Sequence, residues 1–320
     1  MDQGHSHRGE RSGNYRQFRH THSGILVGEI VIFLLSFGGL FLNLLVFYIL
    51  AIRIKIFKID SIISGLITIF DIVASITMLI RLIFKWVLIS MSNYKNFKSF
   101  CAPTGILFFA STITAFDLVC VLGLIRCLVI VFNINLRSMF WTFIVVVLLV
   151  FNWAGASALE WNLPEISWSR FCRRRGEAGK TELFGEIESI KAIVMLIILI
   201  VSYGLIFRFY RKYYENAKKS SSADQHLINE ISTQKKNTSL KLLLLILSYV
   251  IIYIPKFAIF ILYNFTQTSP NDGFEMVSAV LYSMSSIVNA SVLLFVQEET
   301  KQELQYIWTL VFHRAKTVLK

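Results

Sequence analysis

Residues 24–52 read GILVGEIVIFLLSFGGLFLNLLVFYILAI, an almost entirely apolar run. About 20 consecutive apolar residues in a helix are enough to cross the hydrocarbon core of a bilayer. Because lipid offers no partners to backbone N–H and C=O groups, a segment of this kind crosses as a helix. The run therefore predicts one membrane-spanning helix.

Six more apolar runs follow along the chain, and each predicts another spanning helix. They are residues 60–84, 101–132, 138–160, 189–212, 240–263 and 273–296. The expected fold is an all-α membrane protein, a seven-transmembrane helix bundle over residues 24–296, with no internal repeat and no soluble domain.

The two ends of the chain differ from the bundle. Residues 1–23 are polar, and we expect a disordered tail there. In residues 297–320, four apolar side chains recur at helical spacing, namely Leu304, Ile307, Trp308 and Val311. This pattern predicts a short amphipathic eighth helix that lies along the inner leaflet, followed by a tail.

The composition supports a membrane location. Hydrophobic residues make up 55% of the chain and charged residues 16%, whereas a soluble domain keeps about 25% of its residues charged. The net charge of +12 would suggest a nucleic-acid partner in a soluble protein. Here the basic residues cluster between apolar runs, where lipid headgroups account for them. We therefore expect the lipid bilayer as a partner and no nucleic acid.

Three connections between the runs hold much of the remaining polar sequence. Residues 53–59 are short and basic, 161–188 are longer and contain Cys172, and 213–239 are polar and expected to be flexible. Arg and Lys favour the cytoplasmic side of a membrane. Both predicted sides are basic, so the charge pattern gives only a mild preference for an N-terminus outside.

Several polar residues lie inside the apolar runs. Asp71 is in the middle of the second run, Asn43 is in the first, and Ser285, Ser286 and Asn289 share one face of the seventh. Polar groups at membrane depth are costly and usually functional. One interpretation is contact between helices. The other, which we favour for Asp71, is a hydrated switching centre able to hold a sodium ion.

One set of landmark residues resembles the rhodopsin-like (class A) G-protein-coupled receptors over about residues 24–312. The landmarks follow the order of that family, helix by helix: Asn43, Asp71, Cys101, Arg126, Trp153, Tyr203, Pro255 and Asn289. Arg126 also follows Cys101 by the family's interval of 25 residues.

The resemblance implies a receptor at the plasma membrane with an extracellular N-terminus. Such a protein binds a small-molecule or peptide ligand and activates a heterotrimeric G protein, without catalysis and without a cofactor other than a structural sodium ion. It implies a disulfide between Cys101 and Cys172. The sodium ligands would be Asp71, Ser111, Ser285, Ser286 and Asn289. The switch and coupling residues would be Asn43, Asp71, Arg126, Tyr203, Tyr253, Pro255 and Asn289.

The chain departs from the family at five places. Residues 125–127 read Ile-Arg-Cys instead of Asp-Arg-Tyr, and 289–293 read Asn-Ala-Ser-Val-Leu instead of Asn-Pro-x-x-Tyr. Tyr253 replaces a Trp, Met195 stands near the place of a helix-five Pro, and Lys235 or a neighbour replaces an acid at the base of helix six.

These departures leave the function open. Arg126 would lose two restraining ion pairs, which predicts either raised basal signalling or loss of coupling. One alternative is therefore a receptor-like protein that no longer couples. A transporter that uses Asp71 and Asp117 as an ion path is the other, although the inverted repeats of transporters are missing.

Cations gather near the expected ligand cavity. The resemblance assigns six residues to it, namely Arg81, Lys85, Phe108, Thr112, Lys191 and Lys256. Because Arg and Lys bind carboxylates and phosphates, these residues predict a small anionic ligand. Alternatively, the cations reach lipid headgroups or pair with Glu160, Glu186 and Glu188. Phe108 stands where amine receptors carry an Asp, which argues against a biogenic amine.

Three smaller expectations complete the analysis. Asp117 is out of phase with Arg126 on the same predicted helix, so we expect it to pair with a polar neighbour on helix four or five. Cys120 and Cys127 lie within that helix and are expected to be reduced. Asn264 begins an Asn-Phe-Thr glycosylation pattern close to the membrane.

Overall fold

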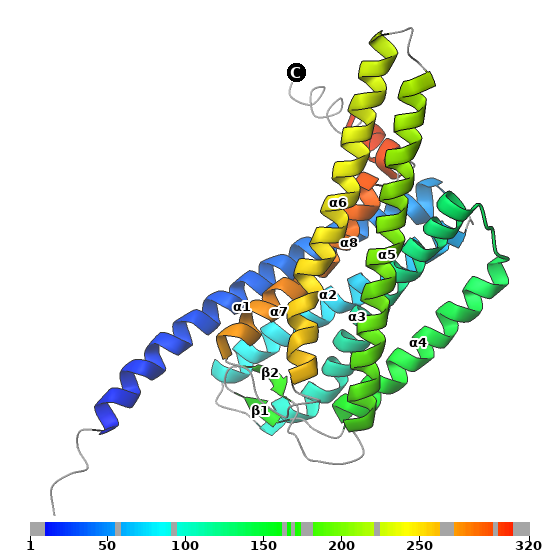
Figure 1. Cartoon of the computed structure of the whole chain (residues 1–320). Helices are drawn as coiled ribbons and strands as arrows, with labels where there is room; N and C mark the ends of the chain where they lie inside the picture. The colour runs from blue at the N-terminus through cyan, green and yellow to red at the C-terminus, as the bar shows by residue number, and fades with distance from the viewer. Residues whose placement is uncertain are drawn as a thin grey trace, which may run out of the picture.

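The computed structural model shows a bundle of long helices (Figure 1). It describes residues 10–54, 59–90, 95–161, 165–167, 170–173, 182–220, 225–262, 272–296 and 300–309. Asn264 and Val311 lie outside the described residues.

The predicted seven spans are confirmed. The helices are α1 (Glu10–Tyr48), which continues as the π-helical turns η1 (Ile49–Ile54), α2 (Ile59–Ser90), α3 (Lys95–Phe132), α4 (Ser138–Trp161), α5 (Glu182–Ser220), α6 (Gln225–Ile261), and α7 (Asp272–Ser283) with α8 (Ser285–Val296). All seven spans are long and apolar enough to cross a membrane. The chain is a multi-pass membrane protein with an all-α bundle.

Two short strands lie in the connection between α4 and α5. Strand β1 (Glu165–Ser167) pairs antiparallel with β2 (Arg170–Arg173). The hairpin lies at one end of the bundle, and the C-terminal segment at the other (Figure 1). We call these the hairpin end and the tail end of the bundle.

Helix α3 forms the centre of the bundle. It packs against α2, α4 and α5, and its side chains from Ala110 to Leu122 are almost all buried. Large apolar side chains on the outer faces of other helices are exposed, including Phe41 at 66% and Phe143 at 67%. An apolar exterior of this kind is suited to lipid rather than water.

The seventh span is interrupted at Met284, between α7 and α8. The Met284 amide donates to both Val280 O (3.2 Å) and Leu281 O (3.0 Å), so the helix tightens for one turn and then resumes. This break places the polar residues of α8 beside Asp71.

The segment 213–239 differs from its expected flexibility. Helix α5 continues to Ser220 and α6 begins at Gln225, and the pair projects beyond the bundle at the tail end (Figure 1). Glu215 accepts from Lys235 at 3.0 Å across the two helices, and the hydroxyls of Tyr214 and Thr238 lie 3.3 Å apart. Lys, Glu and Gln are good helix formers, so a polar composition here did not mean irregular structure.

Helix α1 also begins earlier than expected. It starts at Glu10, inside the segment 1–23 that the sequence analysis assigned to a disordered tail. Adding residues to an existing helix costs much less than starting one, so the first span continues past its apolar run.

The predicted amphipathic eighth helix is confirmed as residues 300–309, which we call the tail helix. Leu304 and Ile307 pack against the core of the bundle, while Trp308 is 64% exposed. Arg53 of η1 holds the tail helix through an ion pair with Glu303 at 3.1 Å. Its guanidinium also lies over the Tyr306 ring.

Candidate functional site

Asp71 occupies the centre of a buried polar cluster between α2, α6 and α8. Its Oδ2 accepts a hydrogen bond from Asn289 Nδ2 at 2.9 Å, and Asn289 Oδ1 accepts one from the Tyr249 hydroxyl at 2.8 Å. All three side chains are at most 1% exposed. A buried amide bonded on both sides fixes the relative positions of the three helices.

Asn43 joins α1 to the same cluster. Its amide donates to Gly39 O and to Ser286 O, both at 2.9 Å. A Cβ added at Gly39 would lie 2.2 Å from Ser286 Oγ, so this close approach of α1 and α8 requires glycine.

The oxygens around Asp71 include candidate ligands for the predicted sodium ion. Asp71 Oδ1 and the hydroxyls of Ser75 and Ser111 are buried and have no hydrogen-bond partner among the described residues. Of the predicted ligands, Asn289 is engaged with Asp71 and Tyr249, and the Ser286 carbonyl with Asn43. A carboxylate and two hydroxyls are oxygen ligands of the kind that hard cations prefer. Ser75, one turn after Asp71 on α2, was missed by the sequence analysis.

Arg81, Phe108 and Lys256 come together nearer the hairpin end. The Arg81 guanidinium lies 6.0 Å from the centre of the Phe108 ring, and Lys256 Nζ lies 5.4 Å from the centre of the Tyr282 ring. The two rings meet edge to face at 6.1 Å. Four helices thus bring two cations to one aromatic pair, which we call the Phe108–Tyr282 pair.

Tyr282 was not among the predicted site residues. It precedes Ser285, Ser286 and Asn289 by three, four and seven residues, which is the spacing of one helix face. This spacing could have found it. Thr112, which was predicted, donates to Phe108 O of its own helix at 2.7 Å and also forms a side-chain hydrogen bond with Tyr282.

A chain of aromatic rings links the Phe108–Tyr282 pair to Asp71. Tyr282 meets Tyr253 at 5.8 Å between ring centres, and Tyr253 stacks on Tyr249 at 6.1 Å. Phe116 of α3 packs on Tyr253 at 4.2 Å. Since Tyr249 bonds to Asn289, contacts run without interruption from Lys256 to Asp71.

Arg126 has an ion-pair partner that the sequence analysis missed. Its Nε lies 3.7 Å from Asp60 Oδ2, in the first turn of α2. The resemblance predicts that Arg126 lacks the two restraining ion pairs of the family, and Asp60 supplies a different one. Arg126 also interacts with the Tyr203 side chain of α5. Tyr203 packs so closely on Gly123 that a Cβ there would lie 2.9 Å from its ring.

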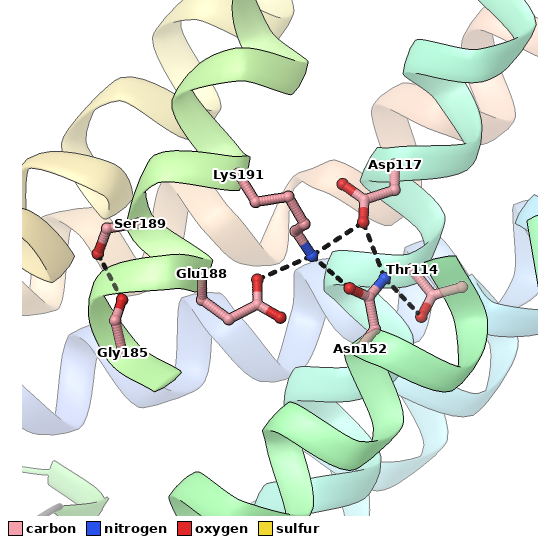
Figure 2. Close-up of polar contacts among 7 residues, drawn as sticks. All are labelled: Thr114, Asp117, Asn152, Gly185, Glu188, Ser189 and Lys191. Carbon is pink, nitrogen blue, oxygen red and sulfur yellow. Dashed lines mark hydrogen bonds and ion pairs between the residues drawn. The ribbon is translucent and has the colours of Figure 1, made fainter. Parts of the chain in front are cut away.

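Asp117 pairs with helices four and five, as predicted. Its Oδ2 accepts from Asn152 Nδ2 of α4 at 2.8 Å and lies 3.0 Å from Lys191 Nζ of α5. Lys191 also pairs with Glu188 at 2.8 Å and donates to Asn152 Oδ1. Figure 2 shows the side chains of Asp117, Asn152 and Glu188 converging on the Lys191 ammonium. We call these four residues the Asp117 cluster.

Two of the predicted ligand cations are paired with acids instead. Lys191 belongs to the Asp117 cluster. Lys85 Nζ donates to Glu29 Oε1, and Trp86 Nε1 donates to Glu29 Oε2 at 2.9 Å. In the described contacts, Arg81 and Lys256 are the predicted cations that lie at the Phe108–Tyr282 pair.

The cysteines divide into two groups. Cys120 and Cys127 are buried and free, as expected for the middle of α3. The side chains of Cys101 and Cys172 are not among those that the structure describes. Strand β2, which contains Cys172, packs against α3, which contains Cys101. The disulfide between these two cysteines stays a prediction.

The comparisons with known proteins add no assignment. No family model matches the sequence, and no curated protein matches it.

Proposed function

We propose that this chain is a rhodopsin-like G-protein-coupled receptor that binds a small anion at its hairpin end. The main support is the continuous set of contacts from Arg81 and Lys256, through the aromatic chain, to Asp71. In this proposal the hairpin end faces outward at the plasma membrane, and a heterotrimeric G protein binds at the tail end.

The ligand would bind at Arg81 and Lys256, over the Phe108–Tyr282 pair. Arg81 offers a planar fork for two oxygens of a carboxylate, phosphate or sulfate, and Lys256 adds a point charge. The aromatic faces suit the apolar part of an organic anion. A small carboxylate is therefore the first ligand class to test.

Ligand binding would change the helices through the aromatic chain. An anion that draws Lys256 away from Tyr282 alters the packing of Tyr253, and Tyr249 passes the change to Asn289. A sodium ion held by Asp71, Ser75 and Ser111 would stabilise the resting arrangement of these residues, because it would supply positive charge beside the buried carboxylate. It would therefore oppose the rearrangement that the ligand causes.

The tail end would bind the G protein once Arg126 leaves Asp60. The Arg126 side chain is 17% exposed and that of Asp60 is 36% exposed. Exposed ion pairs contribute about 0.2–1 kcal/mol, and at 3.7 Å this partly exposed pair is a weak restraint. Helices α5 and α6, which extend beyond the bundle, would supply further contact surface.

An uncoupled receptor-like protein is the second candidate. It is favoured by residues 289–293, which lack the proline and tyrosine of the family, and by Ile125. A transporter is supported less, because in the described contacts Asp71 hydrogen-bonds to α8 whereas Asp117 hydrogen-bonds to α4.

The test is nucleotide exchange on a panel of Gα subunits by the purified protein in lipid nanodiscs. Wild type is compared with Arg126→Ala and with a tail-end control, Arg53→Ala, with and without a mixture of small carboxylates. We expect exchange that Arg126→Ala abolishes and Arg53→Ala preserves. Exchange that is identical in all three would refute the assigned role of Arg126.

Ligand binding is tested separately. The double substitution Arg81→Gln/Lys256→Gln should remove the carboxylate response, while Glu29→Gln/Lys85→Gln should keep it, because that double change removes a balanced ion pair. Carboxylate binding without any nucleotide exchange would select the uncoupled candidate. A carboxylate response that survives Arg81→Gln/Lys256→Gln would exclude this site.

A further inference from the structure

The Asp117 cluster has an unbalanced charge. It contains two carboxylates, Asp117 and Glu188, and one ammonium, Lys191. Both carboxylate side chains are 1% exposed, and the Lys191 side chain is 15% exposed. With all three groups ionised, the formal charge of the cluster is one negative unit.

An uncompensated charge at membrane depth is costly, and proteins avoid it by pairing or by neutralising the group. A second buried ion pair, Glu29 with Lys85, contains one acid and one base. Counted over the described residues, the Asp117 cluster instead lacks one positive charge. The Lys191 ammonium already fills the space between the two acids (Figure 2), which leaves a proton as the fitting ligand.

We propose that the Asp117 cluster is a proton-binding site, in which Glu188 carries one exchangeable proton while Asp117 and Lys191 form the ion pair. The hydrogen bonds decide which acid holds the proton. Asp117 Oδ2 has two donors, Asn152 and Lys191, and donors stabilise the ionised form. Glu188 has one such partner, Lys191, on Oε2. Each acid also has one buried oxygen without a hydrogen-bond partner among the described residues, Asp117 Oδ1 and Glu188 Oε1, so the number of donors distinguishes them.

The surroundings of Glu188 agree with a neutral acid. A Cβ added at Gly155 of α4 would lie 3.2 Å from Glu188 Oε1, so this oxygen faces the backbone of α4. Among the residues that the structure describes, the other ionisable groups that interact with the cluster are Cys120 of α3 and Tyr282 of α7. Both are neutral in their usual form, so neither supplies the missing charge.

Loss of the proton would place two facing carboxylates on α3 and α5, and their repulsion would favour separation of these helices. Helix α5 also carries Tyr203, which interacts with Arg126. Proton binding would therefore regulate coupling, and this last step rests on the proposed function. The proton site itself does not depend on that function.

Infrared difference spectroscopy of the full chain in nanodiscs tests the proposal, because the C=O stretch of a protonated carboxylic acid shifts in D₂O. Charge counting predicts the number of protonated cluster acids in each variant near neutral pH. Wild type should show one protonated acid from the cluster, Glu188→Gln none, and Lys191→Met two. Asp117→Asn should also show none, although Glu188 is retained, because Glu188 and Lys191 are then balanced.

Glu29→Gln is the matched control, since Glu29 is a buried acid in a balanced pair, and it should leave the band unchanged. A wild-type spectrum that matches Glu188→Gln would overturn the proposal. So would loss of the band on adding sodium chloride at constant pH, which would indicate a metal-cation site.

Thermal unfolding decides the case in which a variant folds poorly. Gln is close in shape to a neutral Glu, so Glu188→Gln should unfold within a few degrees of wild type. If Glu188→Gln fails to fold while Glu29→Gln folds, Glu188 is ionised in the native protein and the proposal is wrong.

Discussion

The contact between α1 and α8 at Gly39 gives a prediction whose size follows from the structure. A Cβ at residue 39 would lie 2.2 Å from Ser286 Oγ and 3.2 Å from Ser286 Cβ. Rotation of Ser286 relieves the first contact but not the second, so the two helices must separate. Overpacking of this kind costs about 1–3 kcal/mol, and weakening the Asn43 bond to Ser286 O adds about 1 kcal/mol.

A gain in helix propensity of about 1 kcal/mol offsets part of that cost. We therefore expect Gly39→Ala to lower the free energy of unfolding by about 1–3 kcal/mol. Gly38→Ala is the matched control, because its Cβ would meet only Ile287 Cδ1 at 3.6 Å, an ordinary contact. Gly38→Ala should be neutral or stabilising by up to about 1 kcal/mol.

Thermal unfolding in nanodiscs, followed by circular dichroism, measures both variants. The double variant Gly39→Ala/Ser286→Ala should recover part of the loss, because the clashing hydroxyl is gone and the two changes are coupled. Equal melting temperatures for Gly38→Ala and Gly39→Ala would refute the argument. So would strictly additive effects of Gly39→Ala and Ser286→Ala.

Three further substitutions test the polar contacts. Asp60→Asn removes the ion pair of Arg126 and should raise basal nucleotide exchange in the Gα assay, and exchange at or below the wild-type rate would count against a restraining role. Asn289→Ala leaves both hydrogen-bond partners of Asn289 buried and unpaired, which should destabilise the protein by about 2–4 kcal/mol in thermal unfolding; a melting temperature equal to that of wild type would contradict this. Arg53→Ala breaks an exposed ion pair and should not change the melting temperature measurably, so a large drop would show that the tail helix is held more tightly than its contacts indicate.

The membrane spans were predictable because each one results from a long apolar run, which is a local property of the sequence. A run such as 24–52 has no alternative to a membrane helix, whatever its neighbours are. The ends of the helices were less predictable. Helices α5 and α6 continue through polar sequence because they support each other through Glu215 and Lys235, and such a contact is not visible in either segment alone.

Asp117 and Asp60 show what helical phase can and cannot predict. The phase of Asp117 relative to Arg126 placed it on another face of α3, which correctly indicated partners on α4 or α5. Asp60 has no such signal, because its contact with Arg126 depends on how far α2 and α3 are displaced along their axes. Ser75 was missed although it lies one turn after Asp71, on the same face.

The cations at the hairpin end could not be separated by sequence. Lys85 and Lys191 look like Lys256 in an apolar run, and all three were assigned to one anion site. Lys85 and Lys191 each meet an acid on another helix, at a position that the sequence of a single helix does not reveal. Glu29 lies on α1 opposite Lys85, and Asp117 lies on α3 opposite Lys191.

Counting charge cluster by cluster therefore separates structural from functional groups in this bundle. Glu29 and Lys85 balance each other, which fits a contact that only joins α1 to α2. Arg81 and Lys256 meet aromatic rings in the described contacts, which fits recognition of an anion from outside. The Asp117 cluster has one acid too many, and Asp71 bonds to an amide rather than a base. Within the described contacts, both acidic centres therefore contain more acid than base, so a sodium ion at Asp71 and a proton at the Asp117 cluster would each bind where these contacts leave negative charge uncompensated.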